Sequence, residues 1–185
     1  MIQSTMYRVS FLVELFVEFG YQTVSLLSLN VIFDNIKEVA GWDRYEMFVL
    51  YGFSMIVSQA YVGALGVWNL WLLPEKIKDG EIDFTLLKPI NSQFSLSLGR
   101  PYFTSYLTFA YGFTILLIGL SKLNIILDPI NILFGFVMFI AGLVIMYSIT
   151  TMITSLSFVF INAVNLPRLG GELIYLKKYP HQVYQ

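Results

Sequence analysis

The stretch PINILFGFVMFIAGLVIMYSITTMITSLSFVFINAVNLP, residues Pro129–Pro167, contains no charged residue. A helix of about 20 apolar residues crosses a bilayer core about 30 Å thick, so this stretch exceeds one span but is short for two spans and a turn. A break near Tyr147–Thr151 would give two short helices. One long helix would instead carry a hydroxyl-rich half inside a bundle. The hydroxyl residues of that half are Thr150, Thr151, Thr154, Ser155 and Ser157.

The composition of the whole chain agrees with a membrane environment. It is 57% hydrophobic and 12% charged, with a mean hydropathy of +0.70, whereas soluble domains carry about 25% charged residues. The formal net charge of -1 gives no reason to expect a nucleic-acid partner. With no cysteine, the chain can form no disulfide and no cysteine-ligated metal site.

Four apolar runs indicate an all-α fold, a polytopic transmembrane helix bundle in a single domain, 1–185. The first run is interrupted only by two glutamates, and the second ends in tryptophans and a proline typical of a membrane interface. No small-residue cleavage site follows the first run, so we expect it to be retained. The expected spans are 9–33, 45–73, 102–120 and 130–164, with a loop over 74–100 and a tail over 165–185.

Lysine and arginine counts favour the single long fourth span. With a cytoplasmic N-terminus, eight basic residues lie inside and three outside, which obeys the positive-inside rule; splitting the fourth run leaves five inside and six outside. We therefore expect a multi-pass protein of the cell membrane with its N-terminus and central loop in the cytoplasm. The inside residues are Arg8, Lys76, Lys78, Lys88, Arg100, Arg168, Lys177 and Lys178, and the outside residues are Lys37, Arg44 and Lys122.

The central loop, residues 74–100, is much longer than a helix hairpin needs. Pro74 suits the first position of a short helix, Glu75 suits its positive end, and Gly80 suits the left-handed residue that ends it. The stretch GEIDFTLLKP, Gly80–Pro89, then predicts a second short helix along the membrane face.

The two sides of this second helix differ in character. We expect Ile82, Phe84, Leu86 and Leu87 to anchor it to the span ends, with Glu81, Asp83 and Lys88 facing the cytosol. The pattern fits a docking element that moves the spans, and it fits equally well an ordinary interfacial helix that satisfies its own amphipathy.

The order of a second span, a P-E-K-I-x-x-G-E-I-D-x-x-L-L-K-P loop and a third span resembles the permease subunits of ABC type-2 exporters, in particular the bacterial subfamily without a fused ATPase. Weaker likenesses are Tyr7-Arg8, Gly41-Trp42 with Glu46, and Tyr179-Pro180. Such permeases are similar to six-helix subunits, so we expect the chain to be C-terminally incomplete.

The resemblance implies a mechanism and partners. A cytosolic ABC ATPase dimer would dock on the loop, and a second permease subunit, identical or related, would complete the translocation path in the lipid bilayer. The residues that the resemblance assigns to ATPase coupling are Glu75, Lys76, Gly80, Glu81, Asp83, Leu86, Leu87, Lys88 and Pro89.

Ser10, Glu14 and Glu18 recur at four-residue spacing and form a polar stripe on the first apolar helix. Ionisable residues at membrane depth usually face a cavity, so the stripe fits the lining of a cation or drug path. It fits better an amphipathic entry helix near the cytoplasmic interface, because it lies close to the start of the chain.

Two glycine pairs at seven-residue spacing, Gly112 with Gly119 and Gly135 with Gly142, predict close helix packing. No catalytic cluster, cofactor motif or P-loop occurs in the sequence, so we expect no enzyme activity, no cofactor and no metal site in this chain. An ion-coupled carrier and a non-transporting membrane protein are the alternatives to an ABC permease.

Overall fold

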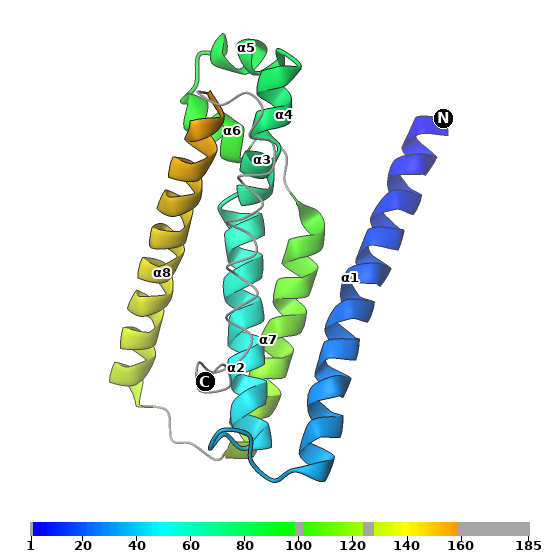
Figure 1. Ribbon diagram of the computed structural model, residues 1–185, viewed down its shortest axis with the longest axis vertical. Helices are drawn as coiled ribbons and strands as arrows, with labels where there is room; N and C mark the ends of the chain where they lie inside the picture. The colour runs from blue at the N-terminus through cyan, green and yellow to red at the C-terminus, as the bar shows by residue number, and fades with distance from the viewer. Residues whose placement is uncertain (1, 99–101, 124–127, 159–185) are drawn as a thin grey trace.

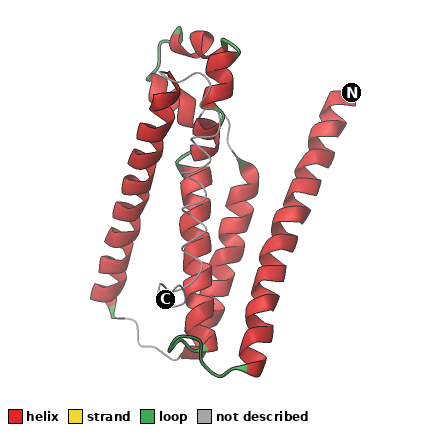
Figure 2. Ribbon diagram, in the orientation of Figure 1, coloured by secondary structure: helices red, strands yellow, loops and turns green. Residues whose placement is uncertain are grey.

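The computed structural model describes residues 2–98, 102–123 and 128–158, and these are almost entirely helical (Figures 1 and 2). Side chains are described from residue 9 onward, except that of Ser157. Four helices in this part are long and apolar enough to cross a membrane. They are α1 (Ile2–Asn35), α2 (Arg44–Gln59) with the π-helical turn η1 (Ala60–Ala64), α7 (Phe103–Leu123) and α8 (Pro129–Ser155).

The second span ends earlier than the apolar pattern suggests. After η1 the chain reverses its local handedness at Gly66, where φ is +63°, and a separate helix α3 (Val67–Trp71) begins. A Cβ at Gly66 would lie 1.9 Å from the carbonyl oxygen of Ser97, so the bare backbone is also needed for close approach. The run over 45–73 is therefore a span followed by a separate turn of helix.

The centre of the bundle is the pair α2 and α7, which touch backbone to backbone at glycines. A Cβ at Gly52 would lie 2.7 Å from the amide nitrogen of Leu116, and one at Gly112 would lie 2.9 Å from the Cβ of Met55. Gly119 lies equally close to Val49. The first predicted glycine pair therefore packs as expected.

The second glycine pair does not. A Cβ at Gly135 or Gly142 would meet no heavy atom within 4 Å among the described residues. The expectation of packing is wrong for this pair in the described part of the chain. The reason is that α8 stands apart along this half, and its apolar side chains there are exposed.

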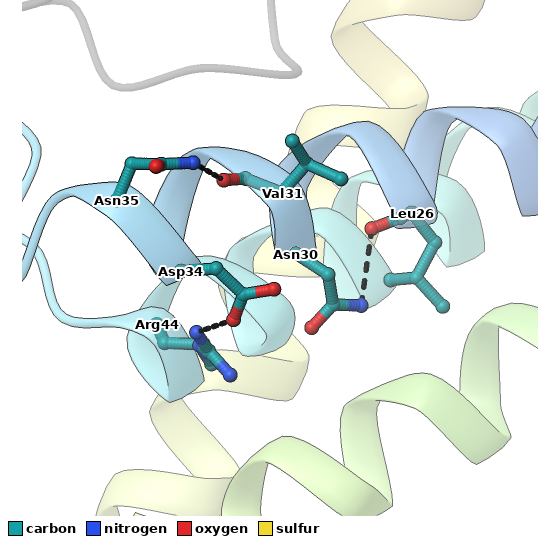
Figure 3. Close-up of polar contacts among 6 residues, drawn as sticks. All are labelled: Leu26, Asn30, Val31, Asp34, Asn35 and Arg44. Carbon is teal, nitrogen blue, oxygen red and sulfur yellow. Dashed lines mark hydrogen bonds and ion pairs between the residues drawn. The ribbon is translucent and has the colours of Figure 1, made fainter.

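The first helix joins the bundle through its C-terminal half. Leu29 and Phe33 pack into a core cluster with residues of α2 and α7, while the N-terminal end of α1 stands away from the other long helices (Figure 1). At the α1–α2 connection, Arg44 forms an ion pair with Asp34 at 2.5 Å (Figure 3). Nearby Asn30 donates a hydrogen bond to the backbone of its own helix. The Asp34–Arg44 ion pair, in contrast, joins α1 to α2.

The fourth apolar run is one continuous helix through residues 147–151, so the predicted alternative of a break there is wrong. Of its hydroxyl-rich half, Thr150 and Thr154 are buried, Thr151 is half-buried and Ser155 is exposed. A 3-10 turn, η2 (Leu156–Phe158), follows. The rest of the expected span to residue 164, and the tail over 165–185, lie outside the described residues.

Candidate functional site

The central loop, which we call the coupling loop (74–98 in the described residues), folds into three short helices at one end of the bundle (Figure 1). They are α4 (Leu73–Lys78), α5 (Glu81–Leu86) and α6 (Ser92–Leu98). Pro74 lies in the first turn of α4, one residue later than expected, and Glu75 follows it.

Gly80 separates α4 from α5 in the expected left-handed conformation, with φ +72°. The amide of Asp79 donates to the carbonyl of Glu75 at 2.9 Å, and the amide of Gly80 donates to Ile77 at 3.2 Å. These bonds satisfy carbonyls at the end of α4. The glycine thus sets the angle between the two helices, and a Cβ there would meet no described atom within 4 Å.

The predicted apolar anchor of α5 is mostly wrong. Ile82 is buried at 5% exposure, but Phe84 is 75% exposed, Leu86 50% and Leu87 81%. Ile82 is thus the one buried side chain of the six-residue helix α5, and the other three predicted anchors are exposed on the surface of the fold. We call Phe84, Leu86 and Leu87 the apolar tip.

Charged residues flank the apolar tip in the sequence. Glu75, Glu81, Asp83 and Lys88 are exposed, as is Pro89, and Lys76 is half-buried. The coupling loop therefore presents three exposed apolar side chains close in sequence to exposed acidic residues. An exposed apolar patch of this kind marks a contact with a protein or a membrane.

The end of the coupling loop is bound to two other elements at Ser97. Its carbonyl oxygen accepts a hydrogen bond from Nδ2 of Asn69 in α3 at 2.6 Å. Its hydroxyl lies 2.7 Å from the hydroxyl of Tyr147 in α8. The Tyr147 hydroxyl oxygen also accepts a hydrogen bond from Nε2 of Gln93 at 3.2 Å. We call these four residues the Ser97 junction. Nothing in the sequence singles them out, because they are ordinary polar residues that come from three separate elements, α3, α6 and α8.

The polar stripe of α1 lies partly against α2. Ser10 is exposed, whereas Glu14 and Glu18 are half-buried. Oε1 of Glu18 accepts hydrogen bonds from Gln22 at 2.9 Å and from Gln59 of α2 at 3.4 Å. The carboxylate therefore links the two helices.

Two neighbours extend this polar contact. The hydroxyl of Tyr51 donates to Oε1 of Gln22 at 2.7 Å, in a buried position between α1 and α2. Gln22 continues the four-residue spacing of Glu14 and Glu18, so the sequence carried a signal for it. Tyr51 and Gln59 carry no such signal, because their role depends on how α2 is placed against α1.

Glu14 lies one turn nearer the N-terminus and interacts with the side chain of Tyr102, just before α7. The ring of Tyr102 stacks on Trp68, with centroids 5.1 Å apart and planes at 17°. Tyrosine and tryptophan rings gather at membrane interfaces. Glu14 is therefore level with an aromatic pair, and Glu18 is one turn further into the helix.

Within the described residues, no group of three or more His, Cys, Asp or Glu side chains is arranged to hold a metal ion. His181 lies outside them. The chemistry that these residues offer is hydrogen bonding, charge and apolar contact.

The four apolar helices and the short helices that join two of them define a multi-pass membrane protein. Residues 19–185 match the family model described as ABC-2 family transporter protein, which is most of the chain. The chain belongs to this family of transporter membrane components. No curated protein and no solved structure matches it.

Proposed function

We propose that this protein is the transmembrane permease subunit of an ATP-driven exporter, coupled to a separate cytosolic ATPase dimer. The observation that carries the proposal is the coupling loop, whose apolar tip and acidic side chains extend beyond the bundle in a member of this family. In this scheme the ATPase binds the coupling loop, and its closure on ATP moves the loop and the attached spans. The spans, with those of a second permease subunit, form the translocation path.

The apolar tip supplies the main contact in this scheme. Burying exposed side chains such as Phe84 and Leu87 removes apolar area from water, at about 25 cal/mol per Å² before the costs of association. Glu81 and Asp83 lie beside the tip and add electrostatic complementarity to a basic surface on the ATPase. If α5 were only an interfacial helix, the apolar tip would instead insert into the membrane. That insertion would bring Glu81 and Asp83 close to the lipid, where acidic side chains are unfavourable.

The proposal requires the coupling loop to be cytoplasmic. Because the chain has no cysteine, single cysteines report on sidedness without background. Lys78→Cys should react with an impermeant thiol reagent only from the cytoplasmic side, and Lys122→Cys only from the other side. The opposite pattern would overturn the orientation.

The docking step is tested by reversing the acidic charge. The double variant Glu81→Lys and Asp83→Lys leaves Ile82 in place, so the protein should insert and accumulate normally. When it is co-expressed with ABC ATPases of the same organism, one at a time, the ATPase that binds the parent should bind the variant at least tenfold more weakly at low salt. Glu38→Lys, an exposed acid before α2, is the matched control and should bind like the parent.

Equal binding of the double variant and the parent would mean that the acids take no part in docking. Loss of binding in Glu38→Lys as well would mean that charge acts on the protein as a whole and not at the loop.

An ion-coupled carrier is the competing function. Such a carrier places ionisable residues in the middle of its spans. Over the described residues of α7 and α8 the only one is Lys122, at the end of α7. Among the described residues, the half-buried carboxylate of Glu18 in contact with Gln59 is the feature that favours the carrier. Ion movement in liposomes without any ATPase would support that function.

A further inference from the structure

We propose that Tyr147 is the residue through which the coupling loop moves α8. It would be a positioning residue, acting on the fourth span through its hydroxyl contact with Ser97. The inference rests on the proposed function, because it needs an ATPase that displaces the loop.

α8 is held to the rest of the bundle mainly at one end. Its first half is exposed on most sides in the described structure, and the side chains that are buried, Leu143, Thr150 and Thr154, belong to the second half. This second half adjoins η1, α3 and the coupling loop (Figure 1). The fourth span is therefore fixed to the bundle chiefly at the coupling-loop end.

At that end, α8 makes hydrogen bonds to both the coupling loop and the second span. Tyr147 bonds the hydroxyl of Ser97 at 2.7 Å and Nε2 of Gln93 at 3.2 Å, and both partners lie on α6. One turn further along α8, Thr150 bonds the buried hydroxyl of Tyr61 in η1. The same face of α8 thus binds the coupling loop at one residue and the end of the second span at the next turn.

The α2–α7 pair and the turn that follows it differ in how easily they can move. The α2–α7 pair is in backbone contact at glycines and has no room to slide without a clash. The turn between this pair and the loop is built from η1 and Gly66, a π-helical segment followed by a left-handed residue. Such π turns interrupt the regular hydrogen bonds of a helix and recur at functional positions. A displaced loop can therefore bend at this turn and carry α8 with it through Tyr147.

The connection between the coupling loop and α8 runs through Ser97. Ser97 is buried, and its carbonyl is held by Asn69 at 2.6 Å, so α6 follows α3 closely. The Asn69–Ser97 bond is buried, the Ser97–Tyr147 bond is half-buried and the Gln93–Tyr147 bond is exposed. Because hydrogen bonds with less access to water are worth more, Ser97 is the stronger of the two partners of Tyr147. Removing the Tyr147 hydroxyl deletes both α6 contacts but keeps the ring, so it separates the connection from the packing.

Distance measurements in the assembled permease–ATPase complex in nanodiscs test the inference. Spin labels at Lys78→Cys and Leu117→Cys report on the coupling loop relative to α7, and labels at Met138→Cys and Leu117→Cys report on α8 relative to α7. All three positions are exposed. Each pair is measured without nucleotide and after trapping with ADP and vanadate.

With Tyr147 present, both distances should change on trapping. In Tyr147→Phe the loop distance should change as before, while the α8 change should fall to less than half. Ser97→Ala removes one of the two contacts and leaves that of Gln93, so it should reduce the α8 change by no more than Tyr147→Phe does. The double variant should be no worse than Tyr147→Phe alone, because the Ser97 contact is already lost in that variant. Tyr106→Phe, an exposed phenol on α7, is the matched control and should keep both changes.

A full α8 change in Tyr147→Phe would overturn the inference, as would a parent in which the loop moves and α8 does not. A parent in which neither distance changes would overturn the proposed function together with it. A purely structural role for Tyr147 would lower the thermal stability of Tyr147→Phe and leave both changes at full size, which also contradicts the inference.

Discussion

The α2–α7 pair and the helix α8 are attached to the bundle in different ways. In the pair, glycines remove side chains from the contact, so that two backbones meet over most of their length. In α8 no described atom lies within 4 Å of a Cβ at either glycine, and the contacts are a small apolar cluster around Leu143 and hydroxyl bonds nearer the coupling loop. Backbone packing of the first kind resists sliding, whereas contacts gathered toward one end allow a helix to tilt. The comparison suggests a fixed centre and a movable outer span.

The largest effect is expected from a side chain placed between α2 and α7. Gly112→Val puts a branched side chain where the Cβ alone would be 2.9 Å from Met55, so the helices must separate. Overpacking of this kind costs about 1–3 kcal/mol, and more where backbone atoms are the obstacle. When the variant is heated in detergent, most of its monodisperse protein should be lost at a temperature well below the one at which the parent is lost.

Gly135→Val is the matched control for this substitution, because it introduces the same side chain on α8 where no described atom lies within 4 Å. It should retain the stability of the parent. Equal damage in both variants would break the contrast between the two regions and would show that Gly135 is also packed in the membrane.

A smaller effect is expected from the hydroxyl contact that joins η1 to α8. Tyr61→Phe removes the buried partner of Thr150 and leaves the ring in place. Hydrogen bonds between membrane helices contribute about 0.6 kcal/mol on average and up to about 1.7. The thermal midpoint of the purified protein should fall slightly, and Thr150→Val should add little to it, because both variants remove one contact.

The smallest effect is expected at the exposed half of α8. The ring of Phe139 meets Phe53 edge-on with centroids 6.2 Å apart, beside an open apolar groove between α2 and α8 of about 460 Å³. Lipid chains replace much of what Phe139→Leu removes, so the cost should stay below about 1 kcal/mol. A drop in thermal stability as large as that of Gly112→Val would mean that this half of α8 is fixed as firmly as α2.

The sequence predicted the long helices well because span length and the absence of charge are strong signals in lipid. It missed the break at Gly66, since that glycine lies inside an unbroken apolar run and its need for positive φ comes from the approach of Ser97. The seven-residue spacing showed that each glycine pair lies on one face of its helix. Spacing alone does not say which of the two faces packs against a neighbouring helix.

Side-chain orientation in the coupling loop was harder to predict. Gly80 was identified from its position after a short helix, because the end of a helix is a local property. The exposure of Phe84 and Leu87 was not, since a six-residue helix is too short for its periodicity to define a face. The Ser97 junction joins three elements and depends on tertiary placement alone.

The measurement that tests the central claim most directly is photo-crosslinking from the apolar tip. A benzophenone amino acid replaces Leu87 in the permease co-expressed with its ATPase, and the same amino acid replaces Phe134 on the exposed face of α8 as a control. The account predicts that position 87 crosslinks to the ATPase and position 134 does not. Crosslinking of position 87 to lipid alone, with the ATPase bound to the complex, would contradict it and would identify α5 as an ordinary interfacial helix.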